Sequence, residues 1–514
     1  MAYTDAMSQT AVNAAVPPPA SLKPTRVRFG VLTFACILSM ITYLDRVCMA
    51  SAAEGFRADL GLHGPGDLNL VLAAFALAYA LFEVPSGWLG DVFGPRNVLI
   101  RIVLWWSAFT ALTGLIGMRV GGYMLGGVGL LIVVRFLFGM GEAGAYPNIT
   151  RALHNWFPLT ERGFAQGTVW MCGRLMGGLT PLIWMVLVEG VRNPWAAASD
   201  AASEPWLPSI LPHWRASFWF FGFVGVVWCV FFALWFRNRP EEKSSVNAAE
   251  LARIRSSAVE SQAAHAGVPW LQIVKSRNLW VLCLMYACQA YGWYFYITYL
   301  HDFLKEQYEV PDGDFLGALY KGGPLWLGAA GCLIGGFLTD GFIRRTGNRR
   351  WGRRVFGIAG HALSALCFVA VYLLVCGNET RFLQPQAQRP NPFWFFLAIS
   401  LAGFFTDLTM APAWAVCQDI GKRYAAIVAG FMNMIGNVGG TLATVVSGFV
   451  LQRSLAAHAN RLGKPLDTLT PLEKAAGNLP GYETNFLLFA AVFVIGACCW
   501  LRIDATKPVV PEEG

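Results

Sequence analysis

Apolar runs long enough to cross a lipid bilayer recur along nearly the whole chain. A membrane-spanning helix needs about 20 mostly apolar residues. Twelve such runs occur, near residues 29–53, 68–88, 98–118, 121–147, 164–189, 216–236, 278–300, 318–342, 355–376, 393–417, 424–451 and 485–501. Because the hydrocarbon offers no water to the backbone, we expect helices whose amides bond internally. We therefore predict an all-α polytopic membrane protein with twelve transmembrane helices.

Composition excludes several other classes of protein. Hydrophobic residues make up 55% of the 514 residues and charged residues only 14%, which is not typical of a soluble globular chain. Nearly all of the 12 Cys fall inside apolar runs and indicate neither a disulfide framework nor a zinc site. The seven His show no metal-ligand spacing, and no GxxxxGK[ST] loop is present for ATP. We expect no metal and no organic cofactor.

The 39 Lys and Arg residues predict the orientation of the chain in the membrane. If both termini lie on one side, 24 of these residues fall on that side, 12 on the other, and three inside helices. Because cytoplasmic segments carry the excess of Lys and Arg, we predict cytoplasmic termini in the cell inner (plasma) membrane. The net charge of +8 then reflects topology and lipid head groups. No basic stripe with interleaved aromatic residues occurs outside the loops, so we expect no nucleic-acid partner.

Two related segments divide the chain into halves. "GWLGDVFGPR" follows the second run and "GGFLTDGFIRR" the eighth, which aligns Asp91 with Asp340 at an offset of 249 residues. Glycines of the fifth run match glycines of the eleventh at an offset of 263, and we expect them to allow close helix packing. The predicted organisation is a mobile cytoplasmic tail (1–28), a six-helix half (29–236), a polar cytoplasmic linker with a short surface helix (237–277), a second six-helix half (278–502) and a cytoplasmic tail (503–514).

The first apolar run contains two adjacent charges, Asp45 and Arg46, in the stretch "ITYLDRVCMA". Successive residues on a helix point about 100° apart, so these two cannot neutralise each other along one face. The fourth run offers Arg135 and Glu142, seven residues apart on one stripe. A charge at the bilayer centre costs about 2.5–3.5 kcal/mol and therefore seeks partners in the interior. We predict an Asp45–Arg135–Glu142 cluster that leaves Arg46 free to bind an anion; the alternative is a purely structural clamp between helices.

Several longer motifs resemble one family of membrane transporters. They are "YLDR" in the first helix, "YALFEVPSGWLGDVFGPR" through the second, "RFLFGMGEAGAYPN" in the fourth, "WFPLTERGFAQG" before the fifth and "FMNMIGNVGG" in the eleventh. With the repeated Gly-x-x-x-Asp motif, nearly the whole chain resembles the anion:cation symporter family of the major facilitator superfamily. The resemblance implies the two-half major facilitator fold and uptake of an organic anion driven by a proton gradient.

Roles for individual residues follow from the same resemblance. In that family the matching helix-one arginine and two tyrosines are associated with the substrate carboxylate, and the matching acids carry protons while the fourth-helix arginine pairs with them. The implied substrate-binding residues are Arg46, Tyr43 and Tyr79. The implied proton-coupling residues are Asp45, Glu142 and Arg135.

Further charges have more than one interpretation. Glu83 in the second helix is either an additional titrating site, included here among the candidate proton-coupling residues, or a contact near the cytoplasmic end of that helix. Arg174 in the fifth helix is either a second anion contact, which would suit a dicarboxylate, or the partner of a neighbouring helix. The loops between paired helices contain four charges that we expect to act in gating: Asp91, Arg96, Asp340 and Arg344.

The second half has no counterpart of the adjacent Asp and Arg, and its candidate substrate contacts are aromatic and amide side chains. They are Gln289 and Tyr291 in the seventh helix and Asn433 and Asn437 in the eleventh, with Trp414, Gln418 and Asp419 in the tenth. Rings and amides suit a polyhydroxylated molecule; packing in the bundle or against lipid is the alternative for most rings. The tripeptide "YLH" at 299–301 replaces the Trp-Leu-Pro that is common in the family, which leaves the sugar open.

These features lead to one expected function and several alternatives. We expect a monomeric proton symporter in the lipid bilayer that imports an organic anion by alternating access, with a sugar acid such as a hexuronate or aldonate as substrate. One alternative is a symporter or facilitator for another carboxylate, such as an aromatic or dicarboxylic acid, with sodium as a further candidate for the coupling ion. The other alternative is a non-transporting nutrient sensor. A sensor would need a long signalling domain, and the tail after Leu501 is short. We expect no enzyme, because the spans lack HExxH and GxSxG motifs.

Overall fold

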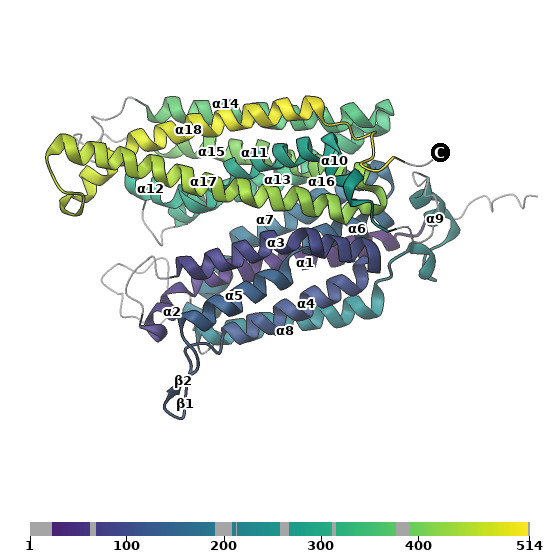
Figure 1. The fold of residues 1–514 in the computed structure, drawn as a ribbon, viewed down its shortest axis with the longest axis horizontal. Coiled ribbons are helices and arrows are strands. Elements are labelled where there is room, and N and C mark those ends of the chain that lie inside the picture. Colours follow the sequence, from purple (N-terminus) through teal and green to yellow (C-terminus); the bar gives the residue numbers. More distant parts are fainter. Residues whose placement is uncertain are drawn as a thin grey trace, which may run out of the picture.

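Two groups of long helices lie side by side in the structure (Figure 1). The computed structural model describes residues 23–61, 68–190, 208–211, 213–256, 267–310, 315–376 and 391–511. The first group, here called the N-half, ends at Trp235, and the second, the C-half, begins at Arg277. This all-α arrangement in two halves confirms the predicted fold class.

The N-half consists of helices and one short hairpin. Its elements are α1 (Val27–Ser51), α2 (Ala53–Leu60), α3 (Asn69–Phe93), α4 (Pro95–Thr113), β1 (Arg119–Val120), β2 (Tyr123–Met124), α5 (Val128–Glu142), α6 (Ala145–Trp156), α7 (Arg162–Trp184) and α8 (Trp214–Trp235). The two strands pair antiparallel, with Val120 opposite Tyr123. Gly94, with a φ of +84°, and Pro95 at the first helical position separate α3 from α4.

The C-half repeats this plan after a linker. The linker contains α9 (Ala248–Arg255) and α10 (Trp270–Lys275). The C-half contains α11 (Arg277–Thr298), α12 (Leu300–Tyr308), α13 (Phe315–Thr346), α14 (Arg349–Val375), α15 (Phe393–Leu408), α16 (Met410–Gly421), α17 (Ala425–Leu462) and α18 (Pro471–Arg502). Thr470 and Glu473 form a capping box that starts α18, since each side chain bonds the backbone amide of the other.

Nine segments of the described residues are long and apolar enough to cross a membrane, judged by length and composition. One of them, Phe393–Leu462, includes α15, α16 and α17, and another, Val128–Trp156, includes α5 and α6. Helices α4 and α11 are not in that set. The predicted twelve spans are consistent with this result, because each half contains six long helices or consecutive helix pairs.

The fourth and tenth apolar runs, each predicted as one helix, are both broken in two. α6 begins at Ala145 after Gly144, whose φ is +84°, and α16 begins at Met410 directly after α15. Ala145 and Met410 are 265 residues apart, and α6 and α16 each contain 12 residues. The repeat thus places a helix break just beyond Glu142 in the N-half and just beyond Asp407 in the C-half.

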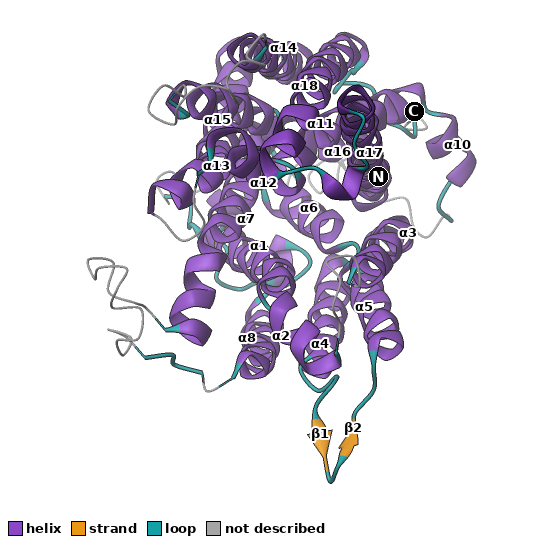
Figure 2. Cartoon of the chain, turned by 90° about the vertical axis from the view of Figure 1, so that its left-hand side faces the viewer, coloured by secondary structure: helices purple, strands orange, loops and turns teal. Residues whose placement is uncertain are grey.

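Both described ends of the chain lie at one end of the bundle, here called the termini end. Thr25 bonds to Glu250 of α9, and the amide of Val509 donates to the carbonyl of Ile420 near the end of α16, 2.9 Å away. In Figure 1 this end lies on the right. The hairpin, α2 and α12 lie at the opposite end, from which Figure 2 views the bundle with the C-half above the N-half.

Two carboxylates cap helices across the halves at the termini end. Asp91 of α3 accepts hydrogen bonds from the second and third amides of α17, at 3.2 and 2.8 Å. Asp340 of α13 accepts hydrogen bonds from the second and third amides of α7, at 3.1 and 2.7 Å. A carboxylate at this position satisfies free amides and the positive end of the helix dipole. Each half therefore caps one helix of the other half.

An ion-pair network completes the closure of the termini end. Asp419 at the end of α16 pairs with Arg162 and with Arg353, both at 3.1 Å. Arg353 also pairs with Asp340 at 3.0 Å. We call these residues the latch: Asp91, Arg162, Asp340, Arg353 and Asp419.

Two predicted gating charges lie outside the latch. Arg96 bonds through its amide to Asn238 and through its side chain to two carbonyls at the end of α8, all within or next to the N-half. Arg344 is exposed on the surface of the C-half. Asp419, predicted as a substrate contact, belongs to the latch instead, because α16 carries it to the termini end. The structure therefore places only Asp91 and Asp340 of the predicted gating charges between the halves.

The linker docks on the N-half through buried charges. Glu250 of α9 is fully buried, and its carboxylate accepts the amides of Val27 and Arg28 at the start of α1, at 3.1 and 3.2 Å. The Arg28 side chain pairs with Glu250 at 3.0 Å and with Glu161 at 2.9 Å. α9 therefore caps the first helix, and it lies in the segment where a short surface helix is predicted.

Removing the charge of Asp340 should open the termini end. Asp340→Asn keeps the side-chain volume but weakens three hydrogen bonds to a charged group, each worth about 1.5–3 kcal/mol. Spin labels at two exposed positions, Phe93→Cys and Trp351→Cys in a background without the native cysteines, report the separation of the halves. We expect pulsed electron resonance to show a larger population of long distances in the variant.

Asp504→Asn is the matched control. Asp504 lies at the same end but accepts its hydrogen bonds from Thr506, within the C-terminal segment. This substitution should leave the distance distribution unchanged. The same distribution in Asp340→Asn as in the parent would contradict the role given to the latch.

Candidate functional site

Charged side chains of α1 and α5 meet inside the N-half. Nε of Arg46 donates to Oε1 of Glu142, 2.7 Å away. The Glu142 side chain is 1% exposed and that of Arg46 28%, so the arginine side chain is the more accessible of the two. The prediction that Arg46 lacks a protein partner is therefore wrong in this structure. Glu142 ends α5 beside α1, whereas Arg135 lies about two turns back along α5.

Asp45 and Arg135 lie in the same region without joining this pair. Asp45 is 3% exposed and Arg135 2%. Neither oxygen of Asp45 has a hydrogen-bond partner among the described residues, and the Arg135 guanidinium lies over the ring of Phe138, 4.3 Å from its centroid. Among the described residues, no ion pair connects Arg135 to Asp45 or to Glu142. The predicted Asp45–Arg135–Glu142 cluster is therefore not connected by ion pairs among the described residues.

Several buried polar atoms of this region lack partners within the described part of the chain. They are Oδ1 and Oδ2 of Asp45, Nη2 of Arg46, Nε of Arg135 and Oε2 of Glu142. A buried polar atom without a partner costs about 1–3 kcal/mol, and more when it is charged. Native proteins satisfy such atoms with water, a proton or a ligand, and charges inside a membrane mark transport pathways. We call Asp45, Arg46, Arg135 and Glu142 the charge cluster.

Both predicted tyrosines lie at this site. The ring of Tyr79 in α3 lies 4.5 Å from the Arg46 guanidinium. Tyr43 precedes Arg46 by three residues on α1, and its hydroxyl accepts a hydrogen bond from Nη1 of Arg174. Tyr43 therefore connects the first helix to a second arginine instead of adding a donor beside Arg46.

That second guanidinium joins the two halves. Arg174 of α7 binds Asp407 of α15 with two parallel hydrogen bonds, Nε to Oδ2 at 2.8 Å and Nη2 to Oδ1 at 3.1 Å. Both side chains are 2% exposed. The ring of Trp293 in α11 lies 4.2 Å from the guanidinium carbon. Of the two predicted possibilities for Arg174, the structure contains the contact with a neighbouring helix.

Sequence reasoning missed Asp407 and Trp293. Asp407 lies in the apolar run "FWFFLAISLAGFFTDL", where the rule that intramembrane charges find partners applies as it does to Arg46. That signal was present in the sequence. Trp293 is one of many rings in the seventh helix, and only its contact with Arg174 distinguishes it from the others.

Glu83 also joins the halves in the interior. Nδ2 of Asn433 in α17 donates to Oε1 of Glu83 in α3 at 2.5 Å. Glu83 is fully buried, and its Oε2 has no partner among the described residues. Glu83 lies eight residues, about 12 Å, from Asp91 along α3, so it is not a contact at the termini end. Asn437 donates to the carbonyl of Asn433 at 3.0 Å.

The two candidates in α11 face different neighbours. Nε2 of Gln289 donates to the carbonyl of Thr406 at 3.1 Å, next to Asp407, and its Oε1 has no partner in the described part of the chain. Tyr291 packs edge-on against Phe489 of α18, 5.6 Å between centroids, inside the C-half. The structure thus brings Gln289 near the second arginine but places Tyr291 among C-half side chains. Helical periodicity alone gave no way to choose between these faces.

An aromatic layer separates the charged groups from the latch. The rings of Tyr146 and Trp170 stack at 4.3 Å, and Trp414 of the C-half lies 5.0 Å from Trp170. On α7, Trp170 follows Arg162 of the latch by eight residues, about 12 Å, and precedes Arg174 by four, about 6 Å. The three rings therefore form a floor that closes the site toward the termini end.

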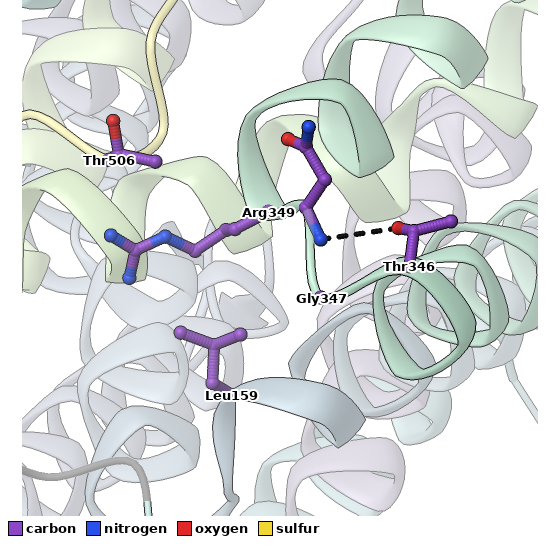
Figure 3. Close-up of a pocket in the computed structure, with 6 residues that line it drawn as sticks. Leu159, Thr346, Gly347, Arg349 and Thr506 are labelled. Atoms are coloured by element: carbon purple, nitrogen blue, oxygen red, sulfur yellow. Dashed lines mark hydrogen bonds between the residues drawn. The ribbon is translucent and has the colours of Figure 1, made fainter.

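A separate pocket of about 580 Å³ lies at the termini end (Figure 3). Leu159 of the N-half lies across from Arg349 of the C-half and Thr506 of the C-terminal segment. One wall is the turn in which the amide of Asn348 donates to the hydroxyl of Thr346 at 3.2 Å. The pocket includes no member of the charge cluster. Within the described ranges, no group of three or more His, Cys, Asp or Glu is placed to hold a metal ion.

Relatives and solved structures are similar to most of the chain. A Cupriavidus necator protein named "Probable sulfoacetate transporter SauU" is 33% identical over 430 residues, 84% of this chain and 88% of that protein. An Escherichia coli protein named "Probable galactarate/D-glucarate transporter GudP" is 26% identical over 443 residues, 84% of this chain and 88% of that protein. The Bacillus subtilis "Hexuronate transporter" is 25% identical over 436 residues, 83% and 89% of the two chains.

Solved structures share the fold. The proton:xylose symporter XylE has a TM-score of 0.64 at 13% identity over 93% of this chain and 96% of that chain. A bacterial homologue of the human lysosomal transporter Spinster has a TM-score of 0.57 at 18% identity over 94% and 99%. The family model that describes the Major Facilitator Superfamily matches residues 35–444. The chain therefore belongs to the Major Facilitator Superfamily and, like these relatives, is a membrane transporter and not an enzyme.

Proposed function

We propose that the chain is a proton-coupled symporter that imports an organic anion by alternating access. The observation that carries this proposal is the Arg46–Glu142 pair, in which a partly exposed arginine side chain is held by one buried carboxylate. The planar fork of an arginine can hold both oxygens of a carboxylate. An incoming organic acid therefore binds Arg46 in competition with Glu142.

Competition for Arg46 couples the anion to a proton. When the substrate takes Arg46, Glu142 is left buried without a counter-ion, and a proton then neutralises it. Anion binding thus favours proton binding, and by linkage proton binding favours anion binding to the same extent. Asp45, whose oxygens have no hydrogen-bond partner in the described ranges, is the second proton site, and Arg135 is the nearby cation.

The latch supplies the gate of the proposed cycle. We place the termini end in the cytoplasm and the protein in the inner membrane, as the distribution of Lys and Arg indicates. The latch and the aromatic floor then close the cytoplasmic side, and the anion reaches Arg46 from outside. Rocking of the halves breaks the latch, and the proton and the anion leave together.

The substrate class follows from the chemistry of the site and from the relatives. Arg46 selects an acid, and the relatives named for sulfoacetate, galactarate/D-glucarate and hexuronate all carry small organic acids by name. Amides at Gln289, Asn433 and Asn437 suit a sugar acid such as a hexuronate or aldonate. The relative with 33% identity supports a second candidate, a short acid that has two acidic groups.

Uptake into proteoliposomes tests the proposal. The panel contains D-glucuronate, D-gluconate, D-glucarate, sulfoacetate and a neutral sugar, each with and without an inward proton gradient. We expect accumulation of at least one acid only when the gradient is present, and no uptake of the neutral sugar. Uptake that does not respond to the gradient would indicate a facilitator, and no uptake of any acid would contradict the anion transport proposed.

Glu142→Gln should separate coupling from exchange. The amide oxygen can still accept the Arg46 hydrogen bond, but the side chain can no longer carry a proton. We expect loss of uptake driven by a pH gradient and retention of counterflow, in which labelled acid exchanges for unlabelled acid inside the vesicle. Loss of both activities in a correctly folded variant would contradict a purely proton-coupling role.

Arg46→Lys should weaken substrate binding while it keeps the positive charge. An ammonium lacks the fork that matches a carboxylate, and one charged hydrogen bond is worth about 1.5–3 kcal/mol, which corresponds to roughly ten- to hundredfold in KM. The matched control is Arg215→Lys, because Arg215 is a buried arginine of α8 that pairs with Asp59 at 2.7 Å, away from the charge cluster. An equal rise of KM in both variants would mean that the Arg46 effect is not specific to the site.

A further inference from the structure

We propose that Arg174 and Asp407 form a second anion subsite, so that the preferred substrate is a dianion whose second acidic group replaces Asp407 on Arg174. This inference rests on the proposed function, in which the first acidic group binds Arg46. It adds the class of substrate and a second residue that takes up a proton.

The contact between Arg174 and Asp407 has the geometry of an arginine that binds a carboxylate ligand. Two parallel hydrogen bonds of 2.8 and 3.1 Å use Nε and one terminal nitrogen of the guanidinium. The other terminal nitrogen donates to the Tyr43 hydroxyl, and Trp293 covers one face of the group. Each of the three guanidinium nitrogens thus donates one hydrogen bond, which fixes the orientation of the group, and Asp407 occupies the place of an acidic ligand.

Tyr43 interacts with both guanidiniums. Tyr43 and Arg46 are three residues apart, which places them on the same side of α1 with about 5–6 Å between their Cβ atoms. Tyr43 bonds to Arg174, so the two arginines lie on either side of this tyrosine. Arg46 is nearer to the end opposite the termini, and Arg174 lies deeper, just above the aromatic floor. A dianion that enters from that end meets Arg46 first and Arg174 second.

The internal repeat relates Asp407 to Glu142. The two acids are 265 residues apart, the same offset as the starts of α6 and α16. Pro147 and Pro412, also 265 residues apart, occupy the third position of these helices. Each acid therefore lies just before a helix break, and each holds one arginine of the N-half. The fold thus contains two arginine–carboxylate pairs whose acids are related by the repeat, Arg46–Glu142 within the N-half and Arg174–Asp407 between the halves.

Charge balance determines what happens to Asp407 when a ligand replaces it. The titratable side chains that interact with Asp407 are Arg174 of α7, Tyr43 of α1, Tyr286 and Tyr296 of α11 and Cys332 of α13. Arg174 is the cation of this set, so a displaced Asp407 has no other counter-ion in it. A proton from the open side then neutralises the carboxylate. The proton leaves on the opposite side when the ligand departs and Asp407 returns to Arg174.

The replacement also acts on the conformation, because Arg174 and Asp407 belong to different halves. In the structure the pair is a direct contact between the N-half and the C-half at the depth of the site. A bound dianion exchanges this contact for one that runs through the ligand. Only a ligand with two acidic groups displaces both Glu142 from Arg46 and Asp407 from Arg174. A monoanion therefore leaves the Arg174–Asp407 pair intact.

Paired acids that differ in one acidic group test the inference on the unmodified protein. Affinities are measured by competition against labelled substrate for D-glucarate with D-gluconate, and for sulfoacetate with methanesulfonate. In the pair of acids that the protein binds better, we expect the dianion to bind about ten- to hundredfold more tightly than the monoanion. This difference corresponds to one charged hydrogen-bonded contact. Equal affinities in both pairs would overturn the second subsite and leave the proposed function intact. Absence of competition by all four acids would also overturn the second subsite, whereas the proposed function fails only if the uptake panel, which includes D-glucuronate, contains no transported acid.

A double substitution isolates the second pair. Arg174→Gln with Asp407→Asn removes both charges and keeps groups that can hydrogen-bond. We expect this variant to bind each dianion no more than about threefold more tightly than its monoanion, since the charged contact is gone. The matched control is Arg162→Gln with Asp419→Asn, an Arg–Asp pair between the halves in the latch, which should retain the preference for dianions. Retention of that preference in the Arg174 variant would overturn the assignment.

Asp407→Asn alone tests whether Asp407 takes up a proton during transport. The number of protons moved with each dianion should fall by one, measured as the membrane potential that balances a fixed substrate gradient in proteoliposomes with defined pH on each side. A merely structural ion pair would change the rate or the stability and leave this number as it is in the parent. An unchanged proton number, in a variant that still transports the dianion, would overturn the role of Asp407.

Discussion

A guanidinium inside a membrane is costly unless an anion neutralises it, and four arginines of this transporter are paired with carboxylates at three depths. Arg46 is held by Glu142, Arg174 by Asp407, and Arg162 and Arg353 by Asp419. In each case the protein supplies the anion from another helix, and for Arg174 and Arg162 that helix belongs to the other half. The arginines therefore fix how the helices pack and, through the shared carboxylates, how the halves meet.

The surroundings of the paired arginines differ among the three depths, and this difference indicates a separate role for the pairs at each depth. At the latch the carboxylates also cap helix N-termini, which gives a contact that is made or broken as a whole when the halves rock. At the charge cluster the Arg46 side chain is partly exposed, and its neighbours have polar atoms without partners in the described part of the chain, so this arginine can exchange partners. The aromatic floor of Tyr146, Trp170 and Trp414 keeps these two environments apart.

The sequence contains enough information for the fold and for the list of charged residues, but not for their pairing. Apolar runs predict the helices, and the repeated Gly-x-x-x-Asp motif predicts two halves, because both depend on local composition and spacing. The partner of Arg46 depends on how α5 ends against α1, and that position is set by the break at Gly144, inside a run that reads as one continuous helix. Arg162 and Asp419 are 257 residues apart, so only the packing of the halves reveals their contact.

The central claim is that an acid and Glu142 compete for Arg46, and proton uptake on binding measures that competition most directly. A pH indicator in weakly buffered solution reports protons taken up when the purified protein is mixed with an acid that it transports, at a pH where that acid is fully ionised. The account predicts uptake of protons in step with binding, and a smaller uptake by the Glu142→Gln variant at equal occupancy. Binding without any change in protons would contradict it.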